Sequence, residues 1–204
     1  MSYHFRYDPR SRYIALYKPF GVLCQFSPAL DGPADRQTLA DFGLPNRVYP
    51  VGRLDHDSEG LLLLTDDRFM TTRLFDESRP HPRRYLVQVE GTPTDDALDA
   101  LSVGPVIEGR RCLPCRVIAL DYVPDLPPRN PPVRYRASIP TSFLILTLYE
   151  GKNRQVRKMT ASVGLPTLRL IRISIGGLYL EDLDLEPGQW TDLEAEQVEE
   201  IFRV

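Results

Sequence analysis

The chain of 204 residues is 42% hydrophobic, with a formal net charge of -3 and three cysteines. This composition predicts one large globular domain or two small lobes that share a core. It excludes a disulfide scaffold, and because no apolar run approaches the ~20 residues that span a bilayer, we expect a cytoplasmic protein.

The charge is distributed unevenly along the chain. Residues 181–204 hold nine acidic residues and one basic residue, which leaves 24 basic and 19 acidic residues over 1–180. The body is therefore basic and the C-terminal segment acidic, so the net charge does not exclude a polyanionic partner.

The N-terminal half alternates strand and helix patterns. The segments 12–17 ("RYIALY") and 22–26 ("VLCQF") predict strands on either side of the turn "KPFG". Apolar spacing predicts a helix within 67–78, and "RYLVQVEG" (84–91) predicts a strand. A second helix is expected to begin after Thr94 as N-cap and to end before Gly104.

The C-terminal half continues the alternation. Strands are predicted at 110–120, 142–151 and 167–178, the five prolines of 121–133 predict an extended connector, and a helix is predicted at about 153–163. A last helix is expected after a capping box formed by Thr191 and Glu194. The pattern predicts an α+β fold with a mostly antiparallel sheet.

Cys112 and Cys115 form a C-x-x-C pair without a second pair or a nearby histidine. A zinc site needs about four such ligands, and the preceding residues do not resemble a redox turn. We therefore expect neither metal nor redox chemistry.

Two basic clusters lie within the body: "SRPHPRRY" (78–85) and "GKNRQVRKM" (151–159). Each is compatible with a solvated surface, and each is compatible with phosphate binding, because fixed cations displace counterions from a nucleic-acid backbone.

The segment "GRLDHDSEGLLLLTDD" (52–67) places Asp55, His56, Asp57 and Glu59 before an apolar run. A polar strand connection explains most of these side chains. Asp55 differs, because Arg53 lies two residues before it and so on the same side of an extended chain. A carboxylate so placed serves as a nucleophile or a general base.

Four motifs resemble, in order, those of the pseudouridine synthases of the ribosomal small subunit synthase A group. "GRLDHDSEGLLLLT" is similar to the catalytic motif of that group, and the resemblance covers residues 13 to about 190. The other three motifs are "YKPFGVLC", "RRYLVQVEG" and "GKNRQVRKMTASVGLPTLRLIRISIGGLYL".

The resemblance implies a reaction without metal or organic cofactor, in which an RNA uridine becomes its C-glycoside isomer. It makes Asp55 the catalytic aspartate, Tyr85 the residue that stacks on the target base, and Arg157 the partner of the aspartate. Asp55 either adds to C1′ or abstracts the C2′ proton to give a glycal, and the sequence leaves both routes open.

The same resemblance implies a pseudouridine synthase fold, with a mixed sheet in two lobes and a central cleft. We expect residues 1–11 to form a tail and 12–204 the catalytic domain, without the S4 RNA-binding domain that most members carry. The expected partner is ribosomal RNA of the large subunit, bound by a monomer. A non-catalytic RNA-binding ribosome-assembly protein is the alternative. The expected RNA contacts are Lys18, Arg53, His56, Arg83, Arg84, Lys152 and Arg154.

Overall fold

The structure, a computed structural model, describes residues 5–28 and 36–203. The chain divides into two compact units, one formed by residues 1–81 and 172–204 and the other by residues 82–171. The boundary falls inside strand β9 (Thr167–Ile175), because Ile171 and Arg172 belong to different units.

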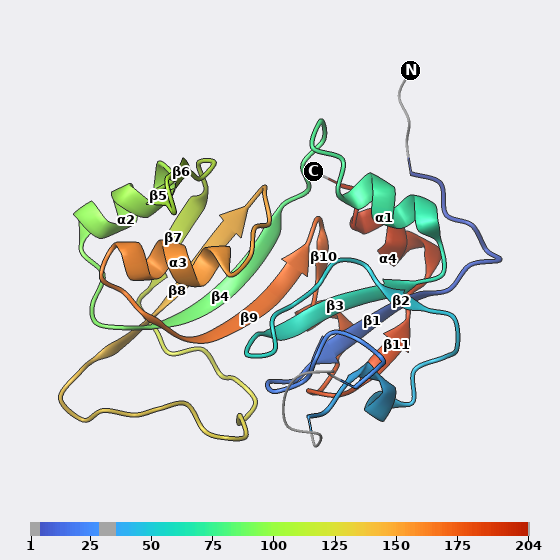
Figure 1. Ribbon diagram of the computed structural model, residues 1–204, viewed down its shortest axis with the longest axis horizontal. Coiled ribbons are helices and arrows are strands. Elements are labelled where there is room, and N and C mark those ends of the chain that lie inside the picture. The colour runs from blue at the N-terminus through green and yellow to red at the C-terminus, as the bar shows by residue number, and fades with distance from the viewer. Residues whose placement is uncertain (1–4, 29–35, 204) are drawn as a thin grey trace. The chain divides into compact units, whose positions relative to one another are not determined.

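The first unit contains strands in the order β11-β1-β3-β9, with β2 paired to β3 and β10 paired to β9 (Figure 1). Strand β1 runs antiparallel to β3, from Tyr13 opposite Thr65 to Lys18 opposite Gly60. Every residue of β1 and β3 is buried, which explains the unbroken apolar run of β3. These strands are β1 (Tyr13–Lys18), β2 (Tyr49–Pro50), β3 (Glu59–Thr65), β10 (Leu178–Tyr179) and β11 (Trp190–Asp192).

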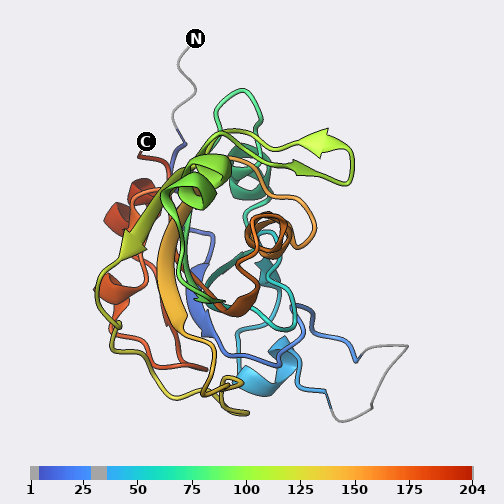
Figure 2. The ribbon, with the colours of Figure 1, turned by 90° about the vertical axis from the view of Figure 1, so that its left-hand side faces the viewer.

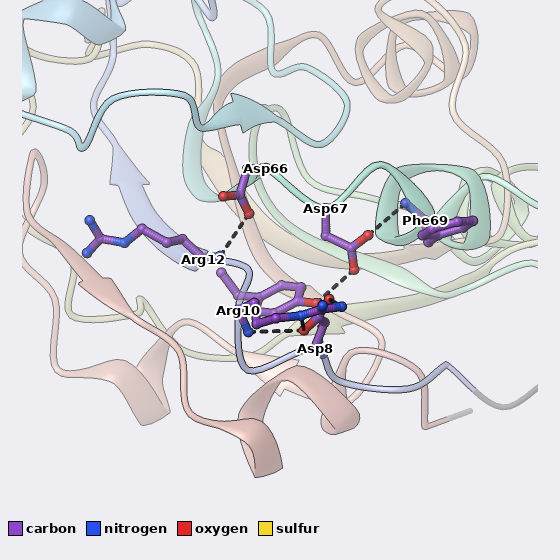
Figure 3. A network of polar contacts seen from close by, with 7 residues as sticks. Asp8, Arg10, Arg12, Asp66, Asp67 and Phe69 are labelled. Atoms are coloured by element: carbon purple, nitrogen blue, oxygen red, sulfur yellow. Dashed lines mark hydrogen bonds and ion pairs between the residues drawn. The ribbon is translucent and has the colours of Figure 1, made fainter.

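Helix α1 of the first unit begins at a buried capping residue. The Asp67 carboxylate accepts a hydrogen bond from the Phe69 backbone N–H (2.8 Å) and another from the Tyr13 hydroxyl (2.7 Å), so it joins α1 to β1 (Figure 3). The helices of this unit are the 3-10 turns η1 (Leu39–Phe42) and η2 (Glu181–Leu183) and the α-helices α1 (Arg68–Leu74) and α4 (Ala195–Glu200).

The segment before β1, which the sequence suggested was a tail, packs on the first unit from residue 5 onward. The Phe5 ring stacks on Phe202 at 4.2 Å between centroids, and the Asp8 backbone N–H donates to the Tyr13 hydroxyl at 3.3 Å. Residues 1–4 lie outside the described residues.

The second unit contains strands in the order β9-β4-β8-β7 and a separate hairpin of β5 and β6. Alternate residues of β4 and β8, such as Val87 and Leu146, share a core with Leu101 of α2 and Met159 of α3. The elements are β4 (Arg83–Glu90), α2 (Asp95–Ser102), β5 (Val106–Ile107), β6 (Arg110–Arg111), β7 (Arg116–Leu120), β8 (Thr141–Leu148) and α3 (Gln155–Ser162).

The expected α+β class is confirmed, and the pairings of β4 with β8 and of β7 with β8 are antiparallel. Thr94 caps α2 as predicted, since its side chain accepts a hydrogen bond from the Ala97 backbone N–H at 3.2 Å. The proline-rich residues 121–133 contain neither helix nor strand, as the sequence indicated.

Three local predictions are wrong. Residues 22–26 form no strand, because after Gly21 (φ 80°) only Leu23 makes an isolated bridge, to Thr38. The predicted strand 110–120 is two strands with Pro114 in the gap, since proline lacks the N–H that a ladder needs.

The third error concerns the last helix. Thr191 lies in β11, opposite Ala15, so it is committed to the sheet. The N-cap is Glu194, whose backbone N–H donates to the Gln197 side chain at 2.9 Å. The box therefore begins three residues later than the sequence suggested.

Strand β1 ends in a lysine whose side chain is fully buried. Lys18 Nζ donates to the Ser58 carbonyl oxygen at 2.8 Å and to the Pro19 carbonyl oxygen at 3.1 Å. Burial lowers the pKa of Lys18 to about 8, although the nearby Cys24, Glu59, Asp57 and Asp55 act to raise it.

We expect the free energy of unfolding to rise between about pH 8 and 10. The folded pKa of Lys18 lies below the unfolded pKa, so the unfolded chain binds more protons in that interval and the folded state gains up to about 3 kcal/mol. Lys18→Met should lack this rise, whereas Lys152→Met, which changes a half-exposed lysine, should retain it. Urea unfolding across this pH range measures the effect, and an equal rise in Lys18→Met would contradict it.

Candidate active site

The loop 52–58, which carries Asp55, runs between β2 and β3 of the first unit. At its start, Gly52 has φ 74°, and a Cβ at this position would lie 2.6 Å from the Phe75 ring. The positive φ favours glycine, and a larger residue would have to displace the Phe75 ring. The Phe75 ring therefore holds the loop backbone close, three residues before Asp55.

Asp55 opens a tight turn, in which its carbonyl oxygen accepts a hydrogen bond from the Ser58 backbone N–H at 3.0 Å. Leu54 and Ser58 are buried, whereas Asp55 is only half-buried. The turn thus keeps the carboxylate within reach of solvent while its neighbours anchor the loop. The Ser58 carbonyl that Lys18 binds belongs to this same turn.

A second connection joins the loop to the turn that follows β1. The Gly21 backbone N–H donates to the His56 carbonyl oxygen at 2.9 Å, and the Phe20 and His56 rings lie 6.4 Å apart. Burial, together with the nearby cation of Arg36, lowers the pKa of His56. A neutral imidazole is therefore favoured beside Asp55 at neutral pH.

Positive charge surrounds the base of the loop. Arg172 is buried, and its Nε donates to the Leu61 carbonyl oxygen at 2.8 Å. Burial raises the pKa of the Cys24 thiol, while the cations of Arg172, Lys18 and Arg53 act in the opposite direction. Because these cations lie around one loop, this part of the first unit suits an anionic substrate.

The predicted residues of the second unit lie on β4 and around α3. Tyr85 is partly buried against the core of this unit, and Arg84 is partly exposed. Arg83 is buried instead: only 7% of its surface is exposed, and a Cβ on Gly151 would lie 3.1 Å from its Nη1. Arg83 therefore has little surface with which to meet RNA.

The second basic cluster begins outside the regular helix. Arg154 is the N-cap of α3, with a left-handed φ of 52°, whereas Arg157 lies within the helix. Arg157 is partly buried, and its Nη1 donates to the Thr167 carbonyl oxygen at 3.4 Å.

Sequence reasoning missed Glu150, which organises this cluster. Its carboxylate accepts hydrogen bonds from the Leu113 backbone N–H (2.9 Å) and the Gln155 side chain (2.6 Å), and it pairs with Lys152 Nζ at 2.9 Å. Burial alone would raise the pKa of Glu150, but these three donors hold it below its usual value. An acid directly before a basic run was the available signal.

Asp55 is not among the lining residues of two cavities, one in each unit. One of about 1070 Å³, in the first unit, is lined by residues of the segment 5–10 and of α1, and none of the predicted site residues lines it. Another of about 420 Å³, in the second unit, lies between the β5–β6 hairpin and α3, and Lys152 lines it.

Within residues 5–28 and 36–203, no three histidine, cysteine or acidic side chains are grouped so that they could hold a metal ion. No helix in this described part of the chain is long and apolar enough to cross a membrane.

Comparison with known proteins gives a consistent result. Residues 12–162 match the family of RNA pseudouridylate synthases. The ribosomal large subunit pseudouridine synthase E of Xanthomonas campestris is 52% identical over 177 residues, which are 87% of this chain and 92% of that protein. The protein of the same name from Vibrio vulnificus is 47% identical over 88% of this chain and 74% of its own length.

A solved structure supports the same assignment. The crystal structure of a pseudouridylate synthase superposes with a TM-score of 0.76 at 26% sequence identity, over 94% of this chain and 74% of that one. The chain therefore belongs to the RNA pseudouridylate synthase family, and it is an isomerase that converts uridine in RNA to pseudouridine.

Proposed function

We propose that this enzyme modifies a specific uridine of large subunit ribosomal RNA and that Asp55 is its essential carboxylate. Relatives named ribosomal large subunit pseudouridine synthase E, 52% and 47% identical, support the substrate. The single observation that carries the role of Asp55 is its half-buried position in a turn anchored by Lys18. The motif resemblance further supports placing the chain in the small subunit synthase A group.

The reaction breaks the bond from C1′ to N1, turns the base and joins C1′ to C5. The proton on C5 leaves to solvent, and N1 takes up a proton, so that the product is an isomer of the substrate. Asp55 would serve either by adding to C1′ or by removing the C2′ proton. Both routes need one carboxylate beside the sugar and no cofactor.

We assign the other two catalytic roles from the sequence motifs. Tyr85 would stack on the target base, because a uridine displaced from folded RNA loses its stacking partners and an aromatic face replaces part of that contact. Arg157 would pair with the aspartate and keep it ionised.

Exposure divides the expected RNA contacts into two groups. Arg53, Arg154 and Lys152 are exposed, and Arg84 and His56 are partly exposed, which supports contacts with RNA. The burial of Lys18 and Arg83 supports a different role for these two, as supports of the loop and of the start of β4. We propose that the enzyme acts as a monomer, since its sequence has no coiled-coil heptad.

Asp55→Asn should fold and lose all turnover. The amide keeps the size and polarity of the side chain but removes the nucleophile or base. Release of tritium from RNA labelled at C5 of uridine measures the reaction, and Asp57→Asn, the same change two residues on, is the control that should remain active. Turnover by Asp55→Asn above background would refute the assignment, and no release by the parent protein would leave a non-catalytic RNA-binding protein.

Tyr85→Phe should bind RNA as tightly as the parent, because the ring is what stacks. Tyr85→Ala and Tyr85→Leu should bind about tenfold more weakly, since stacking on one base contributes about 1–3 kcal/mol. Tyr122→Ala, which removes an exposed ring of the same unit, is the control. Filter binding gives the affinities, and equal binding by Tyr85→Phe and Tyr85→Leu would remove the stacking role.

Arg157→Ala should lower kcat by about 100-fold or more and change RNA affinity far less, because its proposed partner is the aspartate rather than a phosphate. Arg157→Lys keeps the charge and should recover part of kcat. Single-turnover rates at saturating RNA separate the two effects. A loss confined to affinity would make Arg157 a phosphate contact.

A further inference from the structure

The hairpin of β5 and β6 in the second unit places an acidic residue at its tip. Val106 pairs with Arg111 and Ile107 with Arg110, so Glu108 and Gly109 form a two-residue turn. Both have positive φ, 51° and 78°, which is the type I′ geometry that asparagine and glycine adopt most readily. The glutamate thus occupies a position that disfavours its side chain.

This hairpin extends beside helix α3 (Figure 2). Residues of both line a cavity of about 420 Å³. Three of the residues that line it are cations, from three different segments: Arg110 on the hairpin, Lys152 before α3 and Lys158 within α3. The polar side chains of Asn153 and Gln155 also line the cavity. Such a lining favours an anion with several oxygen acceptors.

Two carboxylates pair with the lysines, and they are held very differently. Glu150, paired with Lys152, also accepts hydrogen bonds from Leu113 and Gln155, so it is part of the framework. Glu108 pairs with Lys158 at 2.9 Å, but 73% of its side-chain surface is exposed.

We propose that this cavity docks a backbone phosphate of the substrate RNA and that the Glu108 carboxylate occupies the place of that phosphate in the free protein. The proposal rests on RNA as the substrate and does not depend on which RNA is modified. It adds Lys158 and Arg110 to the residues proposed to contact RNA. Glu108 then competes with the phosphate for these cations.

Replacing the Glu108 carboxylate by a phosphate requires little free energy. An exposed ion pair contributes little to stability, and the Glu108 side chain can turn into solvent without leaving a packed core. An arriving phosphate would accept hydrogen bonds from Lys158 and Arg110 and release its counterions. A carboxylate that stays near the cavity repels the phosphate, so RNA affinity is held below the value that the cations alone would give.

The test measures RNA binding by the full chain as a function of salt. At low salt, Glu108→Gln should bind about three- to tenfold more tightly than the parent, because it removes the competitor. Lys158→Gln and Arg110→Gln should each bind more weakly, with the slope of log affinity against log salt shallower by up to about 0.7. In the Lys158→Gln background, Glu108→Gln should raise RNA affinity by a smaller factor, since the two residues act through one ion pair.

Charge-matched controls separate a local effect from a general one. Glu196→Gln and Arg116→Gln make the same charge changes at exposed positions outside the cavity and should alter affinity much less. Thermal melts establish that each variant is folded. Unchanged or weaker binding by Glu108→Gln, or equal effects at the control positions, would overturn the proposal.

A further arm uses inorganic phosphate as the probe. If millimolar phosphate protects the parent against thermal unfolding and Lys158→Gln abolishes this while RNA binding stays unchanged, the cavity takes a free anion and the RNA proposal is wrong. Tritium release distinguishes the two proposals. Turnover by Asp55→Asn would show that the catalytic assignment is wrong, and no release by the parent would show that the proposed function is wrong, whereas both results leave the binding comparison intact.

Discussion

The candidate site depends on the hydrogen bonds that the buried ammonium group of Lys18 donates to two loops. Strand β1 places this group in the interior of the first unit. There it donates hydrogen bonds to the Pro19 carbonyl oxygen in the turn after β1 and to the Ser58 carbonyl oxygen in the Asp55 turn. Removing a lysine from water is costly, and its lowered pKa reflects that cost. The cost is offset because one side chain fixes two loops, and Gly21 and Phe75 then hold the same loop from other sides.

The second unit uses a partly buried carboxylate in a corresponding way. Glu150 gathers a backbone N–H from the segment before β7, the side chain of Gln155 and the ammonium group of Lys152. Basic residues close together repel one another, so a run such as 151–159 keeps a defined geometry only where an acid compensates part of the charge. In each unit an ionised side chain binds backbone groups, fully buried in the case of Lys18 and partly buried in the case of Glu150. The side chains proposed to meet RNA are more exposed.

Most of the fold could be predicted because it follows from local patterns. The apolar runs of β1, β3 and β8 and the Thr94 cap are encoded within a few residues. Several failures concern residues whose role is set by distant partners: Thr191 follows a capping pattern but pairs with Ala15. Lys18 and Arg83 are basic residues of the kind that contacts RNA, yet both are buried. A sequence gives the charge of a side chain but not the depth at which it lies.

The acidic residues of this enzyme also differ in their surroundings, and these decide whether an acid stabilises the fold or affects RNA binding. Several acids of the C-terminal segment have structural partners, as where Asp192 pairs with Arg12 at 2.9 Å and Glu200 pairs with Arg203. Glu108 is different, since it lies on an exposed turn among cations. An enzyme that modifies one uridine must also release its product, and each phosphate contact that strengthens binding slows release. A carboxylate that competes with one phosphate lowers affinity and so favours release, while the cations stay in place to contact RNA once the carboxylate has turned into solvent.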